Sequence, residues 1–108
     1  MIDTSNTIDG KPLYYLINEK NLLVPEDAGY VGIINSTNIT VKNLNLGHNY
    51  QGVLVAFSNG SILENLTLLN TINGITLFSS SDNILQSLLI ANTYFDLDSN
   101  FYYNGIVF

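Results

Sequence analysis

The feature that most constrains this chain is an internal repeat. Residues 36–46, 58–68 and 80–90 align without a gap, so the repeat has a period of 22. Five aligned columns are aliphatic in every copy: Val31/Val53/Ile75, Ile33/Val55/Leu77, Val41/Leu63/Leu85, Leu44/Leu66/Leu88 and Leu46/Leu68/Ile90. A repeat of this length indicates one structural unit used several times, so the fold must be built by stacking such units.

The aliphatic positions within each repeat lie mostly two residues apart, in short runs bounded by Ser, Asn and Gly, which is typical of β-strands rather than helices. One unit has too little apolar surface for its own core, so the units must stack with like residues over like residues. We therefore predict an all-β fold, a right-handed parallel β-helix (solenoid) of about three to four coils of 22 residues.

The corners of these coils explain the abundance of asparagine, 16 of 108 residues. We predict a structural ladder in which Asn43, Asn65 and Ser87 share a buried corner, because Asn tolerates unusual backbone angles and its amide can bond the equivalent residue one coil away. Gly52 and Gly74 are predicted to occupy another corner, where the missing Cβ permits a positive φ.

Two segments break the period. Residues 95–103 are nine extra residues and are predicted to form a lateral loop. Residues 13–17 and 22–24 are predicted to be the strands of a projecting N-terminal β-hairpin, because the repeat register is lost in that part of the chain.

We expect a single β-helix domain over residues 1–108, with residues 1–29 as an irregular hairpin excursion and residues 30–108 as the repeat coils. So few coils are usually not stable alone, which suggests a fragment of a longer solenoid. Exposed coil ends and edges predict end-to-end or lateral self-association.

Charge and composition exclude several functions. Nine acids against three lysines and no arginine give a net charge of −6, which is unsuited to phosphate neutralisation, so we expect no nucleic-acid partner. The absence of cysteine excludes thiolate metal sites and a cysteine nucleophile. The segment has neither a long apolar run nor the layout of a signal peptide, and we expect no membrane insertion by it.

Residues 80–90, Ser-Ser-Asp-Asn-Ile-Leu-Gln-Ser-Leu-Leu-Ile, approximate the pattern Ser-Ser-Asn-Asn-x-Ile-x-Asn-x-x-Ile. Together with Gly74-Ile-Thr-Leu77 before them, they resemble the NosD-like parallel β-helix repeats. Residues 3–15 and 25–29 also resemble a stretch that precedes such repeats in archaeal members. The resemblance implies a pectin-lyase-like superfamily fold, found in carbohydrate-binding and sugar-hydrolysing proteins, and an extracellular, cell-surface or periplasmic location. A fold alone does not determine chemistry.

Two enzyme classes are suggested by this resemblance, and the residues favour neither. Polysaccharide lyases of the superfamily resemble one another in using a basic residue, commonly arginine, which this chain lacks. Hydrolases need two carboxylates about 5 to 10 Å apart, but Glu64 and Asp82 fall in different columns. We expect no catalytic residue and no cofactor, with a lyase or glycoside hydrolase whose catalytic residues lie outside this segment as the alternative.

A second alternative, also from the family name, is a NosD-type periplasmic accessory for metal-site assembly. Copper sites need several His, Met or Cys ligands, whereas the chain has only His48 and Met1. His48 is therefore predicted to be an exposed turn residue. Asp96, Asp98 and Asn100 alternate like calcium ligands, but Phe101 and Val107 stand where the familiar loop has Gly and Glu, which favours a solvated acidic loop.

Aromatic residues gather in the two excursions and are candidate glycan contacts, with packing against the coils as the alternative. The candidates are Tyr14, Tyr15, Phe101, Tyr102 and Tyr103. Four sequons begin at Asn35, Asn38, Asn59 and Asn65, of which Asn38 and Asn59 are the better glycosylation candidates because they fall in turns. The sequence thus predicts a non-catalytic scaffold of an extracellular or cell-surface protein that binds carbohydrate or associates with itself.

Overall fold

The computed structural model describes residues 2–3, 7–8, 10–46, 51–69, 73–91, 94–98 and 101–107. Every regular element in these ranges is a β-strand. The strands are β1 (Ile2–Asp3), β2 (Thr7–Ile8), β3 (Lys11–Ile17), β4 (Tyr30–Ile34), β5 (Thr40–Asn45), β6 (Gln51–Ala56), β7 (Ile62–Leu69), β8 (Asn73–Phe78), β9 (Asn83–Ala91), β10 (Tyr94–Asp98) and β11 (Phe101–Val107). The described residues contain no helix with the length and apolar character needed to cross a membrane.

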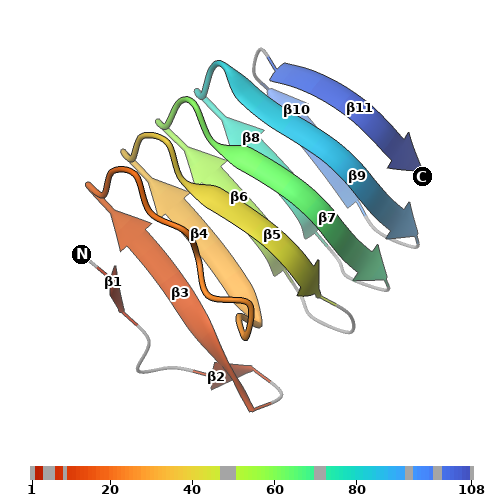
Figure 1. Cartoon of the computed structure of the whole chain (residues 1–108), viewed down its shortest axis with the longest axis horizontal. Coiled ribbons are helices and arrows are strands. Elements are labelled where there is room, and N and C mark those ends of the chain that lie inside the picture. The colour runs from red at the N-terminus through yellow and green to blue at the C-terminus, as the bar shows by residue number, and fades with distance from the viewer. Residues whose placement is uncertain are drawn as a thin grey trace.

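The strands form two sheets, and from β4 onward successive strands alternate between them (Figure 1). Sheet 1 has the order β1-β3-β4-β6-β8-β10, with β2 also paired to β3, and sheet 2 has the order β11-β9-β7-β5. Strand pairs within the repeats are parallel, whereas β1 and β2 pair with β3 in the antiparallel sense. The protein is therefore all-β, with parallel strands in two sheets.

The register of the sheets follows the sequence repeat. In sheet 1 Val53 pairs with Val31 on one side and Ile75 on the other. In sheet 2 Leu63 pairs in the same way with Val41 and Leu85. Residues one repeat apart are thus neighbours in adjacent strands, which confirms the alignment.

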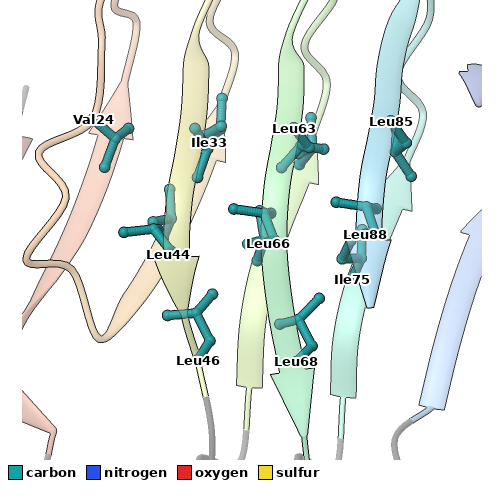
Figure 2. Packing of buried hydrophobic residues seen from close by; sticks show 14 of the residues in the cluster. Val24, Ile33, Leu44, Leu46, Leu63, Leu66, Leu68, Ile75, Leu85 and Leu88 are labelled. Carbon is teal, nitrogen blue, oxygen red and sulfur yellow. The ribbon is translucent and has the colours of Figure 1, made fainter. Parts of the chain in front are cut away.

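The core contains aliphatic side chains from both sheets, including the five predicted columns, in one buried cluster. Figure 2 shows them in rows, such as Leu44, Leu66 and Leu88, that cross neighbouring strands. Alternation along a strand directs every second side chain inward, and each fully buried leucine contributes roughly 1.5–3 kcal/mol. Because the apolar columns carry this burial, they determine how the strands align.

Corners between strands are marked by positive φ angles in three columns. Asn is the commonest residue in them, since its short polar side chain lowers the penalty of the left-handed region. The columns are Asn18/Asn35/Phe57/Ser79, Asn21/Asn38/Gly60/Asp82 and Asn43/Asn65/Ser87, with φ between 46° and 72°. Equivalent backbone hydrogen bonds link the first column to the adjacent strands. The amides of Asn18, Asn35 and Phe57 donate to the carbonyls of Ile34, Ala56 and Phe78, respectively.

The predicted hairpin of residues 13–17 and 22–24 is wrong. Leu16 pairs with Ile33 in a parallel ladder, and Leu23 bridges Thr40, also in parallel. Leu16 lies in the core, and Tyr14 packs against it. Paired residues of β3 and β4 are separated by fewer residues than one repeat, so an alignment at a single period does not reveal this pairing. The antiparallel turn near this end joins β2 to β3 instead.

The predicted lateral loop at residues 95–103 is also wrong. Phe95 pairs with Ile75 in sheet 1, and Tyr102 pairs with Ile84 in sheet 2. Both pairings span less of the chain than one repeat, because the connections before and after β10 are shorter than the corresponding connections around β8. The repeat continues here in shortened form.

Gly52 and Gly74 lie in strands, and neither has the positive φ that was predicted. A Cβ built on Gly52 would overlap the carbonyl oxygen of Gly74 and lie 2.5 Å from Leu68 Cδ2. Gly52 is therefore needed for a close approach of two backbones rather than for its conformational freedom.

Candidate functional site

The structure does not bring the predicted aromatic contacts together. Tyr14 and Tyr15 lie in β3 of sheet 1, whereas residues 101–103 lie in β11 at the far end of sheet 2 (Figure 1). Each of the three pairs with a residue of β9 and belongs to the sheet. The five candidates therefore lie in strands of two different sheets and not in lateral loops, and their contact with glycans stays a prediction.

The two tyrosines of β3 lie on opposite faces of sheet 1. Tyr14 packs against the core, and its hydroxyl donates a 2.8 Å hydrogen bond to Asp27. Loss of solvent and the neighbouring Asp27 carboxylate both raise the pKa of Tyr14. This phenol therefore anchors the segment before β4.

Tyr15 lies on the other face of the sheet, with its ring centroid 5.5 Å from that of Tyr30. Gly32 leaves room for this ring, because a Cβ there would lie 2.9 Å from Tyr15 Cδ1. Burial of the Tyr30 side chain, with a smaller contribution from the nearby Tyr15, raises the pKa of Tyr30 to about 12. These rings stabilise the outer face of sheet 1 by packing on one another.

The solvated acidic loop that the sequence favoured over a calcium site does not form at Asp96 and Asp98. Asp96 and Asp98 are strand residues of β10 and pair with Thr76 and Phe78. Asn100 and His48 lie outside the described residues. In the part of the chain that the structure describes, no three His, Cys, Asp or Glu residues are grouped in a way that could hold a metal ion.

The predicted ladder residues Asn43, Asn65 and Ser87 all have positive φ, between 53° and 58°. Asn65 Nδ2 donates a 2.7 Å hydrogen bond to Asn43 Oδ1, as expected for an amide ladder. The predicted burial of this corner is wrong, since all three residues are exposed. Each of these residues adds one position between two inward-facing residues of its strand. Val41 and Leu44 therefore both face the core although they lie three residues apart.

The two glycosylation candidates are both exposed and differ in their bonding. Asn38 Nδ2 donates a 3.0 Å hydrogen bond to Asn21 Oδ1, so this amide belongs to a corner column. Asn59 accepts a 3.5 Å hydrogen bond from Thr37 Oγ1. Asn65, which also begins a sequon, is exposed as well.

A stack of buried serines was not singled out from the sequence. Ser58 Oγ accepts from the Ser36 amide at 2.9 Å, and Ser80 Oγ accepts from the Ser58 amide at 3.1 Å. Each hydroxyl also donates to the carbonyl two residues earlier, so these buried hydroxyls are satisfied. The signal was available, because serine opens each aligned copy of the repeat.

The residues that most resemble a binding site were also missed. Phe57 is 59% exposed and Phe78 45% exposed, and their ring centroids lie 5.5 Å apart in an edge-to-face arrangement. Phe57 has a φ of 52°, a left-handed backbone that is rare for a bulky residue and costs roughly 1–2 kcal/mol. The signal was the presence of Phe in a corner column that has Asn35 and Ser79 on either side.

The polar groups on sheet 2 have simpler roles. Lys42, Glu64 and Gln86 share one register column on its outer face. Gln86 Nε2 donates a 2.9 Å hydrogen bond to Glu64 Oε1, which links β9 to β7. The geometry of this column is that of cross-strand pairing between solvent-facing side chains.

No protein-family model matches this chain, and no curated protein matches it.

Proposed function

We propose that this chain is part of a right-handed parallel β-helix that serves as a non-catalytic scaffold of an extracellular or cell-surface protein and binds carbohydrate. Support for the β-helix comes from the alternation of strands between two sheets and from the pairing of residues one repeat apart. Such a scaffold presents equivalent side chains at intervals of roughly 4.8 Å along one axis. A periodic ligand such as a polysaccharide suits a periodic surface.

The observation that carries the binding role is the composition of the outer face of sheet 1. Between β3 and β8 two register columns cross this face, and none of their residues is charged. The columns are Tyr15/Gly32/Leu54/Thr76 and Ile17/Ile34/Ala56/Phe78. Mostly apolar surfaces with a few polar groups at the edge are typical of sites that stack on sugar rings.

A binding scaffold and an enzyme can be separated by one experiment with two measurements. The protein is applied to immobilised neutral and uronate polysaccharides, and the same polysaccharides are assayed for new reducing ends. We expect retention on neutral polysaccharide without reducing ends. Reducing-end release would overturn the non-catalytic role, and failure to bind any polysaccharide would overturn the binding role.

Self-association is measured in the same samples by analytical ultracentrifugation. The proposed binding role requires retention on polysaccharide by the monomer. If only associated chains are present and none is retained, the apolar face is an interface between copies, and the carbohydrate role is wrong.

A further inference from the structure

The most unusual surface feature of the described residues is the contact between Phe57 and Phe78. Among the residues whose side-chain exposure the structure describes, four large apolar side chains are exposed, and these two touch each other. The other two, Leu23 and Leu89, are aliphatic. The aromatic pair lies where sheet 1 ends and the chain turns toward sheet 2.

Folding does not explain phenylalanine at position 57. The first corner column has Asn18 and Asn35 before it and Ser79 after it, all with positive φ. Asn35 Nδ2 donates a 2.5 Å hydrogen bond to Asn18 Oδ1, and phenylalanine at position 57 cannot extend this bonding. Phe57 therefore adopts an unfavourable backbone conformation and interrupts the side-chain amide ladder of this column. Most of its side chain is exposed to water. Strain retained at an exposed position is a reason to look for function there.

The groups beside the pair suit hydroxyl groups. Asn35 and Ser79 are the neighbours of Phe57 in its column, on adjacent strands about 4.8 Å away on either side. Among the described residues, neither Asn35 Oδ1 nor the Ser79 hydroxyl has a hydrogen-bond partner. An amide oxygen and a hydroxyl therefore flank the exposed rings and can bond a ligand that carries hydroxyl groups.

The charges argue against an acidic ligand. Asp98 pairs with Phe78 in the register, and the chain carries a net charge of −6. The nearest lysine in the corner register is Lys20. Lys20 pairs with Thr37, and Thr37 pairs with Asn59, which is in the same repeat as Phe57. Lys20 therefore lies two strands away from the Phe57 repeat. A uronate or phosphate would find no cation beside the rings among the described residues, whereas an uncharged sugar needs none.

We propose that Phe57 and Phe78 form a stacking platform for the apolar face of an uncharged pyranose ring, with Asn35 and Ser79 bonding its hydroxyls. This inference rests on the carbohydrate-binding role proposed above and assigns its site. The ring faces supply the area for contact with sugar C–H groups, and the flanking polar groups orient the sugar.

The test measures binding of cellohexaose, mannohexaose and xylohexaose to the full chain by isothermal titration calorimetry. Phe57→Asn restores the residue type that the column has at position 35, so this variant is expected to fold. Phe78→Thr removes the second ring with a residue that suits a strand. Leu89→Asn is the matched control, because Leu89 is 44% exposed and lies on the outer face of sheet 2.

At least one hexasaccharide is expected to bind the unaltered chain. Phe57→Asn and Phe78→Thr are each expected to weaken that binding at least tenfold, with Leu89→Asn within twofold of the original. Circular dichroism verifies that each variant has retained the β-sheet spectrum.

The outcomes separate the site from the role. Binding that survives both Phe substitutions overturns this site but leaves the carbohydrate role standing. No binding of any hexasaccharide by the unaltered chain overturns both. Self-association that Phe57→Asn abolishes, without hexasaccharide binding, would assign the pair to a second copy of the chain and contradict the proposal.

Discussion

The outer faces of the two sheets differ much more than their inner faces do. Both inner faces are aliphatic and contribute to one core. On the outside, sheet 2 presents Lys42, Glu64 and Gln86 in one column and an exposed Asn/Ser corner in another. Sheet 1 presents the Phe57–Phe78 pair and two columns that are uncharged from β3 to β8, before Asp96 and Asp98 continue them in β10. Since core packing makes the same demand on both sheets, the difference indicates that the outer face of sheet 1 is under a further constraint.

The largest test of this comparison is at Gly52, where sheet 1 has no spare room. Gly52→Ala places a methyl group against the backbone of Gly74, and overpacking of this kind costs about 3 kcal/mol. We expect that loss in the free energy of unfolding, measured by urea denaturation.

Gly10→Ala serves as the control for the Gly52 variant. Gly10 has a φ of 78° and no atom within 4 Å of an added Cβ, so it isolates backbone strain, about 1 kcal/mol. A loss at Gly52 no larger than the loss at Gly10 would contradict the close approach of the two backbones in sheet 1.

The second test uses pH and the buried tyrosine of sheet 1. Tyr30 is 4% exposed, and its pKa rises from 10.0 to about 12 in the folded protein. Because the folded state favours the protonated phenol, its contribution to stability is fully present below pH 10 and is lost as the pH rises from 10 to 12. We expect a decrease of about 2 kcal/mol over this window.

Tyr30→Phe is the matched variant, since it keeps the ring and removes the titrating group. Urea denaturation at pH 8 and pH 11.5 should show a smaller decrease for this variant than for the unaltered chain. An identical decrease in both would mean that other groups, and not Tyr30, cause the alkaline loss.

The sequence predicted those parts of this fold in which all repeats have the same length. The pairing of Val53 with Ile75 follows from a gap-free alignment, because buried columns tolerate few residue types. The parallel pairing of the strand at residues 13–17 and the strand at residues 94–98 were not predicted, because corners can gain or lose residues without disturbing the columns between them. Pairings shorter than the repeat therefore escape a search at one fixed period.

The candidate site was harder to predict for a different reason. An aromatic residue in a sequence is ordinarily assigned to packing, and whether its ring faces water depends on neighbouring strands. The alignment placed Phe57 in the column of Asn35 and Ser79, but the meaning of that replacement depended on the positive φ of the corner. The φ angle is a property of the corner and is visible only in the structure.

The smallest expected effect concerns the polar corner of sheet 2, where Asn43 has a φ of 58° and accepts a hydrogen bond from Asn65. Asn43→Ala removes both the tolerance of the left-handed region and the acceptor, and is expected to cost about 1–2 kcal/mol in the free energy of unfolding. Asn43→Gly keeps the backbone angle and loses only the exposed hydrogen bond, for an expected cost of about 0.5 kcal/mol. If the two variants lose the same stability, the amide ladder stabilises this corner and the backbone angle does not. If neither loses any, the corner of sheet 2 contributes nothing measurable, and the buried aliphatic columns stabilise the fold without it.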